Sequence, residues 1–191
     1  MTRTASIARN TKETQITLNL NLDGGEIAIN TGIGFFDHML TAFAAHGNFG
    51  LKVDITGDLQ VDTHHTVEDA GIALGTAFRQ ALGTNPQIAR FGSFFVPMDE
   101  ALAFAAVDVS NRAYLVYDAV FPEAKCGDYD TCMTYEFFTA FANNAGLTLH
   151  MRAEYGLNSH HITEALFKAA AHAMRLAVVP REALLSTKGT L

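Results

Sequence analysis

The chain contains one segment twice, and this repeat limits the folds that it can adopt. Residues 63–82 read THHTVEDAGIALGTAFRQAL, and residues 159–178, which begin 96 positions later, read SHHITEALFKAAAHAMRLAV. Self-similarity at a fixed spacing indicates that one structural unit is built twice. The shared positions are two adjacent histidines, a glutamate and an arginine: His64, His65, Glu68 and Arg79 in the first copy, and His160, His161, Glu164 and Arg175 in the second.

The similarity extends upstream of this segment. HMLTAFAAHG, which begins at His38, matches EFFTAFANNAG, which begins at Glu136, at an offset of 98 positions. ETQITLNLNLDG, from Glu13, has a looser counterpart in EALAFAAVDVSN, from Glu100. We therefore interpret the chain as two pseudo-repeats and a tail, at about residues 1–88, 89–180 and 181–191.

The hydrophobic periodicity predicts the elements of each unit. Residues 14–22 alternate apolar and polar side chains, as a half-buried strand does. The turn Asp23-Gly24-Gly25 then predicts a hairpin, with a second strand directly after it. The expected elements that follow are a helix over about 36–45 ending near Gly47, a strand over 49–55, and a longer helix over 63–82 ending at Gly83.

Packing requirements predict how the two units combine. A sheet with two helices on one face leaves its helical layer half exposed, and packing two such layers together buries both. With 49% hydrophobic residues, the chain has enough apolar side chains for this core, and no low-complexity linker divides the halves. The expected fold is one compact α+β unit over residues 1–191, with duplicated halves of hairpin, helix, strand and helix.

Charge and composition exclude several classes of function. The net charge of -7 disfavours a nucleic-acid partner, because few cations are available to neutralise phosphates, and favours a small molecule. No apolar run is long enough to span a membrane, and MTRTASIARN lacks the apolar core of a secretory signal, so we expect a cytoplasmic protein. Cys126 and Cys132 are too few for a disulfide framework or a zinc knuckle.

The duplicated histidines have the spacing of metal ligands. Residues at i and i+4 share one face of a helix, so His64 and Glu68 can hold one ion while His65 points roughly 100° away. The second helix has the same arrangement, and each helix can lend its other histidine to a second ion. His38 and Glu136, at equivalent positions of the preceding helices, are candidates for further ligands.

A single pair of adjacent histidines on a helix is more often a solvated feature than a set of ligands. Its duplication on equivalent helices is what favours metal binding here. Nitrogen and carboxylate ligands without thiolate suit Mn²⁺, Fe²⁺ or Zn²⁺, and six-coordinate chemistry favours manganese. His46, His150 and His172 lack the motif, so we assign none of them to a metal.

Over essentially its full length the chain resembles the imidazoleglycerol-phosphate dehydratase family, through TGIGFFDHML, DTHHTVEDAGIALG, GLNSHHITEALFK and STKGTL. The resemblance implies two four-stranded sheets around a central layer of helices. It also implies an assembly of 24 chains whose active sites, each with two Mn²⁺ ions, form between subunits. The implied activity is that of a carbon–oxygen lyase in histidine biosynthesis, which dehydrates imidazoleglycerol phosphate to imidazoleacetol phosphate.

The resemblance further assigns ligands to the two ions. For one ion they are His38, His64, Glu68 and His161. For the other they are His65, Glu136, His160 and Glu164. Position 136 departs from the family pattern, because many relatives carry histidine there, and a carboxylate oxygen would have to take the place of the imidazole.

The same resemblance implies the chemistry and the contacts to the substrate. Metals on the ring nitrogens would stabilise an imidazolate that expels the neighbouring hydroxyl and leaves a diazafulvene-like intermediate, whose C–H a carboxylate can then deprotonate. Glu13, at the substrate, and Glu164 are both candidates for the acid/base. Asp99 either lines the site or is a turn residue. The family's phosphate-contacting positions correspond to Arg90, Arg112, Lys168, Ser186 and Lys188.

Two other functions stay open at this point. A metal-storage or metal-sensing protein could also present duplicated helices with histidine and glutamate, but would need no cations for phosphate. A binuclear metallohydrolase would release inorganic phosphate from phosphate esters.

Overall fold

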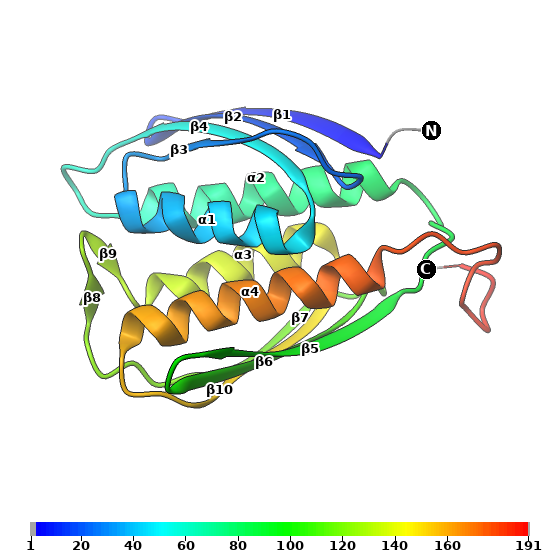
Figure 1. The fold of residues 1–191 in the computed structure, drawn as a ribbon. Helices are drawn as coiled ribbons and strands as arrows, with labels where there is room; N and C mark the ends of the chain where they lie inside the picture. The colour runs from blue at the N-terminus through cyan, green and yellow to red at the C-terminus, as the bar shows by residue number, and fades with distance from the viewer. Residues whose placement is uncertain (1–2, 191) are drawn as a thin grey trace.

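The computed structural model describes residues 3–190, which form two layers of strands with four helices between them (Figure 1). The first half contains β1 (Thr4–Asn10), β2 (Thr14–Asn21), β3 (Ile27–Asn30), α1 (Gly34–Gly47), β4 (Gly50–Gly57) and α2 (His64–Leu82). The second half contains β5 (Phe91–Met98), β6 (Ala101–Asp108), β7 (Tyr114–Asp118), α3 (Met133–Ala145), β10 (Thr148–Tyr155) and α4 (Ser159–Ala177). Between β7 and α3, the short strands β8 (Lys125–Cys126) and β9 (Tyr129–Asp130) pair with each other.

The two sheets have the same topology. Their strand orders are β1-β2-β4-β3 and β5-β6-β10-β7, so each strand has an equivalent at the same place in the other sheet. In each sheet every pair of neighbouring strands is antiparallel except one. The exception is β3 with β4 in the first sheet and β7 with β10 in the second. The expected α+β fold, with two four-stranded sheets around a central layer of helices, is therefore confirmed.

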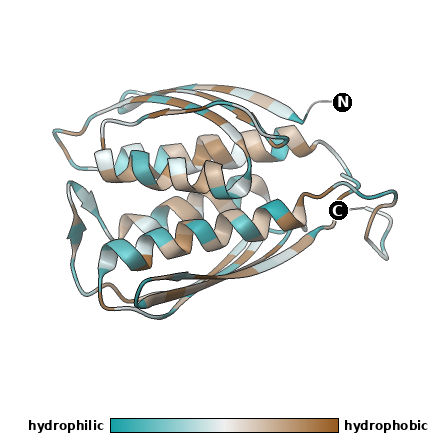
Figure 2. Cartoon of the chain, in the orientation of Figure 1, coloured by the Kyte–Doolittle hydropathy of each residue, from teal (hydrophilic) through white to brown (hydrophobic). Residues whose placement is uncertain are grey.

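The strands turn one face to the helices and the other outward. In β2, Ile16, Leu18 and Leu20 are buried against the helical layer, whereas the alternate residues Gln15 and Thr17 are exposed. The hydrophobic and hydrophilic residues that alternate along the strands are visible in Figure 2. The period of two seen in the sequence thus reports the burial of one face.

One prediction about the strands was wrong. The turn at residues 23–25 does not close a hairpin, because β3 pairs with β4 and not with β2; the hairpin is formed by β1 and β2. Both edges of β2 are already paired, one with β1 and the other with β4, and both of these strands are longer than β3. The chain at residues 24–25 instead passes close to β4, and Gly50 allows this approach, since a Cβ on Gly50 would lie 2.9 Å from the carbonyl oxygen of Gly24.

The other predicted elements of the first half are confirmed within a few residues: α1 ends at Gly47, β4 covers the predicted strand, and α2 ends before Gly83. Within residues 3–190, no helix has the length and apolar character needed to cross a membrane.

Each helix packs against a helix of the other half. α1 lies along α4 and α2 lies along α3, so both contacts join the two repeats (Figure 1). Aromatic rings of α1 and α3 fill the centre: Phe36 meets Phe137 edge-on at 5.4 Å between centroids, and Phe43 meets Phe141 in the same way at 6.0 Å. These rings hold the two halves together as one core.

The contact between α2 and α3 depends on glycine. A Cβ on Gly71 would lie 2.6 Å from the carbonyl oxygen of Phe137, and a Cβ on Gly75 would lie 2.6 Å from that of Phe141. At these two positions, one turn apart, the backbones approach too closely for any side chain.

We expect Gly75→Ala to destabilise the protein by about 1–3 kcal/mol, because the added methyl overpacks the helix contact. In an exposed helix the same change would stabilise by about 1 kcal/mol. Gly34→Ala is the matched control, since a Cβ at that helical position meets nothing within 4 Å. Denaturant unfolding of both variants measures the difference, and equal stabilities would contradict the close packing.

Candidate metal centre

One cluster of ligand-type side chains lies at the N-terminal end of α4. Nitrogen and oxygen atoms of His38, His160 and Glu164 all lie within 4.8 Å of one another. Nε2 of each imidazole is 3.3 Å from Oε2 of Glu164. His160 and Glu164 are one helical turn apart, and the packing of α1 on α4 brings His38 to them. Two imidazoles and a carboxylate that converge in this way suit a divalent transition metal, so the residues fit such an ion.

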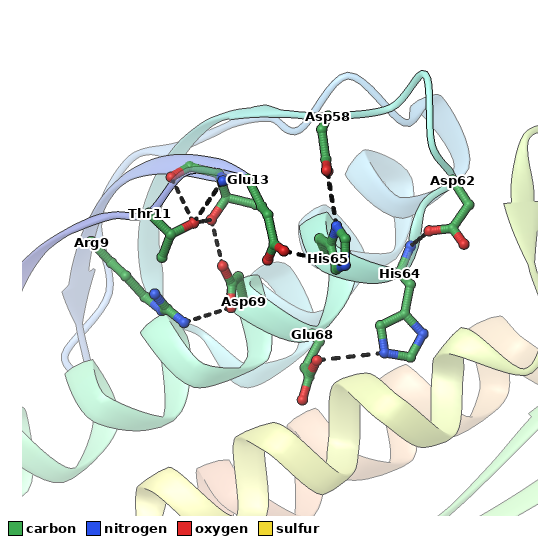
Figure 3. Close-up of polar contacts among 10 residues, drawn as sticks. Arg9, Thr11, Glu13, Asp58, Asp62, His64, His65, Glu68 and Asp69 are labelled. Carbon is green, nitrogen blue, oxygen red and sulfur yellow. Dashed lines mark hydrogen bonds and ion pairs between the residues drawn. The ribbon is translucent and has the colours of Figure 1, made fainter.

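The cap of α4 fixes the backbone that carries these ligands. Oδ1 of Asn158 accepts hydrogen bonds from the backbone N–H groups of His160, at 2.8 Å, and His161, at 3.3 Å. In the first half, Asp62 is at the equivalent position and accepts a bond of 2.8 Å from the N–H of His64 (Figure 3). Each adjacent pair of histidines therefore begins its helix at a capped end.

Glu164 is buried and fully engaged. Oε1 accepts from Nζ of Lys168 at 2.5 Å, while Oε2 faces the two imidazoles. Burial raises the pKa of Glu164. The Lys168 ammonium and His38 together lower this pKa by more than burial raises it, so the net pKa lies below its ordinary value. The carboxylate is thus held in the ionised form that binds a metal.

The corresponding residues of the first half lie on α2. Nε2 of His64 is 3.5 Å from Oε2 of Glu68, one turn away, and both side chains project from α2 toward α3 (Figure 3). Glu136 lies on α3, which packs against α2, just as His38 lies on α1, which packs against α4. Glu136 therefore has the same place relative to His64 and Glu68 that His38 has relative to His160 and Glu164. Among residues 3–190, only the group with His38 forms a cluster of three ligand-type side chains.

This arrangement differs from the expected division of ligands between two ions. We expected His38 to share an ion with His64 and Glu68, but it lies with His160 and Glu164. The reason is that each HHxxE helix packs against the shorter helix of the other repeat, not against the one that precedes it in the chain.

The other two histidines are oriented by carboxylates. Nδ1 of His65 lies 3.0 and 3.1 Å from the oxygens of Asp58, and Nδ1 of His161 lies 2.7 Å from Oε2 of Glu100. Because an ionised carboxylate only accepts, each Nδ1 carries a proton, and Nε2 is the ring nitrogen that faces away from this bond. The hydrogen bonds with Asp58 and Glu100 raise the pKa of the two imidazoles, and that with His161 lowers the pKa of Glu100 to about 2.

Glu13 and Glu100 are equivalent residues with different surroundings. The Glu100 carboxylate also accepts from the backbone N–H groups of Leu157 and Asn158, at 3.1 and 2.9 Å. The Glu13 side chain is 54% exposed, and its nearest ion-pair partner is Nε2 of His65 at 3.8 Å. We did not predict a role for Glu100 or Asp58, although the match between ETQITL and EALAFA was a signal for Glu100.

Asp99 is a turn residue, as one of its two predicted descriptions has it, and its carboxylate lies near His161. It has a φ of 49° in the turn between β5 and β6, and its carboxylate lies 3.6 Å from Nε2 of His161.

Four of the five predicted phosphate contacts come together. Arg90, Arg112, Ser186 and Lys188 line one cavity of about 310 Å³. The carboxylate of Asp108 holds Arg90 at 2.7 Å and lies 3.6 Å from Arg112. The fifth residue, Lys168, lies instead beside Glu164.

The cavity and the metal cluster lie at opposite ends of the helical layer. The backbone N–H of Arg90 bonds to the carbonyl of Ala177, at the last residue of α4, whereas His160 and Glu164 lie in its first two turns. The thirteen residues from Glu164 to Ala177 span about 20 Å at roughly 1.5 Å per residue. One chain therefore does not place its cavity next to its own cluster.

A second pair of histidines, His46 and His172, lies outside the candidate metal cluster. Nδ1 of His46 and Nε2 of His172 are 3.1 Å apart, and the ring of His172 stacks on Phe94 at 4.4 Å. Burial, followed by nearby positive charge, lowers the pKa of both imidazoles. His150 is exposed on the outer face of β10. Among residues 3–190, none of the three belongs to a metal cluster.

We expect His160→Ala to abolish Mn²⁺ binding at the α4 cluster and to weaken assembly, because it removes one of three converging donors. Isothermal titration with MnCl₂ and sedimentation measure the two effects. His150→Ala, on the outer face, is the control and is expected to bind as the wild type does. Unchanged titration of the His160 variant would rule out this ligand set.

The half-buried pair His46 and His172 predicts a dependence of stability on pH. Unfolded histidine has a pKa of about 6.5, and the folded pKa is lower, so the contribution is fully present above about pH 6.5 and is lost as the pH falls. The melting temperature should therefore drop less between about pH 7.5 and 5.5 in His46→Asn/His172→Asn than in the wild type. His150→Asn should follow the wild type, and parallel curves for all three proteins would refute the prediction.

The comparisons with known proteins agree with this geometry. A family model described as imidazoleglycerol-phosphate dehydratase matches residues 31–174. The imidazoleglycerol-phosphate dehydratase of Pelobacter propionicus is 55% identical and that of Lacticaseibacillus casei is 56% identical, and each match covers at least 99% of both chains.

Solved structures give the same result. A crystal structure of imidazoleglycerol-phosphate dehydratase from Staphylococcus aureus matches with a TM-score of 0.86 and 36% identity, over 93% of this chain and 99% of that one. The enzyme of Pyrococcus furiosus matches with a TM-score of 0.87 and 38% identity, over 97% and 100%. With more than half of its residues identical to named relatives along the whole chain, the protein belongs to the imidazoleglycerol-phosphate dehydratase family.

Proposed function

We propose that the chain is a carbon–oxygen lyase that dehydrates imidazoleglycerol phosphate to imidazoleacetol phosphate in histidine biosynthesis. The observation that carries the proposal is the convergence of His38, His160 and Glu164 at the end of one of two matching helices. A substrate with an imidazole ring and a phosphate requires ions that bind nitrogen and a separate site for an anion. The chain offers residues for both.

We propose Mn²⁺ as the resident ion at two centres, with Fe²⁺ or Zn²⁺ as weaker candidates. One centre would use His38, His160 and Glu164. The other would use His64, Glu68 and Glu136. His65 and His161, whose Nε2 atoms are free of the Asp58 and Glu100 hydrogen bonds, would complete the centres of a neighbouring copy. When bound, such ions act as Lewis acids toward the substrate's imidazole ring.

The surroundings of the two candidate carboxylates favour Glu13 as the general acid/base. Both oxygens of Glu164 are already engaged by Lys168 and by the imidazoles, so it serves as a ligand. Glu13 is half exposed, is 3.8 Å from His65, and has a carboxylate free to face a substrate. A carboxylate in this position can remove or return a proton at the substrate carbon, a contribution of roughly 10²–10⁴-fold in rate.

The separation of the cavity from the cluster supports active sites that are shared between chains. Arg90, Arg112, Ser186 and Lys188 would bind the phosphate of a substrate whose ring is held by the metal ligands of another copy. Arginine offers paired donors to phosphate oxygens and lysine a point charge. Lys168 stays a predicted phosphate contact on the chain that holds the metal. A closed assembly of 24 chains is the form that we propose for these shared sites.

Glu13→Gln should lower kcat by about 10²–10⁴-fold, because it removes the proton-transferring carboxylate and keeps the size of the side chain. Glu26→Gln is the control, since Glu26 is exposed and pairs only with Lys52. Formation of imidazoleacetol phosphate is measured after removal of metal with a chelator and again after addition of Mn²⁺. Activity should be lost in the first step and restored in the second.

Other outcomes separate the alternative functions. Release of inorganic phosphate from the substrate would identify a metallohydrolase. Mn²⁺ binding with no turnover, and no thermal stabilisation by an imidazole phosphate compound, would identify a storage or sensor protein. Either result would overturn the proposed lyase.

A further inference from the structure

At one place beside the site, a polar group in the first half corresponds to apolar residues in the second half. At the interface of α2 with the first sheet, the first half has Arg9, Asp69 and Thr14. Strand register and helix alignment place three apolar residues at the equivalent positions of the second half: Val96, Ala165 and Ala101.

Arg9, Asp69 and Thr14 form a connected polar group, which we call the Arg9 triad. Nη2 of Arg9 donates to Oδ1 of Asp69 at 2.8 Å (Figure 3). Oγ1 of Thr14 donates to Oδ2 of the same carboxylate. Asp69 is 7% exposed and Thr14 1%. Both carboxylate oxygens are therefore satisfied inside the protein.

The fold itself does not require this group. Val96 and Ala101 are buried at the same places in the second sheet, and Ala165 is buried on α4. The Asp69 carboxylate is buried, whereas the Arg9 side chain is 30% exposed. Burying a charge is costly, and replacing a buried ion pair with apolar residues is often neutral or stabilising. The same backbone thus folds with apolar residues at these positions in the second half. The polar residues in the first half therefore need another explanation.

The Arg9 triad acts on the turn that carries Glu13. Oγ1 of Thr11 accepts from the backbone N–H groups of Glu13, at 3.1 Å, and Thr14, at 2.9 Å. The N–H of Thr11 bonds in return to the carbonyl of Thr14 at 2.8 Å. The hydroxyls of Thr11 and Thr14 are 3.3 Å apart. Asp69 therefore fixes Thr14, and Thr14 closes the turn.

Glu13 needs such support because its carboxylate has none of the bonds that hold Glu100. Glu100 is fixed by two backbone N–H groups and by His161. In the first half the hydrogen bond to Nδ1 of His65 is made by Asp58 and not by Glu13. Its position is then set by the backbone of residues 11–14.

We propose that the Arg9 triad is a positioning device, which holds the turn at residues 11–14 so that the Glu13 carboxylate faces His65 and the substrate. This inference rests on the proposed role of Glu13 as acid/base. Positioning of a reacting group to within about 1 Å can change a rate by about 10²-fold, so the loss of the triad should appear in kcat.

The test compares Thr14→Val, which removes the hydroxyl at nearly constant volume, with Thr14→Ser, which keeps it. In the Mn²⁺-loaded enzyme, Thr14→Val should lower kcat by roughly 10- to 100-fold with KM changed by less than about threefold. Thr14→Ser should restore most of the rate. Hydrogen exchange of the amides of residues 11–14 should be faster in Thr14→Val than in Thr14→Ser. Thr17→Val, the same change on the outer face of β2, is the control and should alter neither value.

A second variant, Arg9→Val/Asp69→Ala/Thr14→Ala, gives the first half the side chains of the second. It should remain folded, retain Mn²⁺ binding, and lose kcat as Thr14→Val does. If it fails to fold, then the comparison of Thr14→Val with Thr14→Ser decides alone. Wild-type kcat in Thr14→Val, or unchanged exchange at residues 11–14, would overturn the proposal. A wild-type chain without dehydratase activity would instead overturn the proposed function, and exchange would show separately whether the triad orders the turn.

Discussion

The structure depends on the contact between the helices of the two halves. Each four-stranded sheet buries only one face against its own helices, and the far side of that helical layer is apolar as well. α1 on α4 and α2 on α3 close this surface, with the rings of Phe36, Phe43, Phe137 and Phe141 at the centre. The same contact makes the metal cluster, because His38 reaches Glu164 only across it. Stability and ligand geometry therefore have one origin.

Duplication gave the two halves one backbone, and substitution gave them different tasks. Glu13 and Glu100 precede equivalent strands, yet one is half exposed and the other is held by three hydrogen bonds. Asp58 in the first half orients the histidine that a glutamate orients in the second. A pseudo-symmetric fold thus provides its own comparison: the buried residues Thr14 and Asp69 have apolar equivalents, Ala101 and Ala165, that are also buried in the other half.

The ends of the helices separate two kinds of chemistry. Histidine and glutamate side chains, the candidate ligands, gather at the N-terminal ends of α2 and α4, whereas the arginines and the serine–lysine tail gather beyond the C-terminal ends. A helix of this length keeps the two groups far apart within one chain. Under the proposed function, a substrate that needs both would be bound by more than one copy, and assembly would be part of the catalytic machinery.

The sequence by itself determined the duplication, the helices and most strands, and it identified the histidines and glutamates that are the candidate ligands. These features are local: the period of a helix places His160 and Glu164 on one face whatever surrounds them, and an alternating strand reports its buried side. Only the tertiary structure decided that β3 lies beside β4, that His38 joins the α4 pair, and that Glu100 is held while Glu13 is free. These features depend on which surfaces pack together across long sequence separations. Because the two repeats have the same local pattern, the sequence does not say which helix packs against which. The physical reason is that backbone periodicity acts within an element, whereas the choice of neighbour is made by the packing of the whole core.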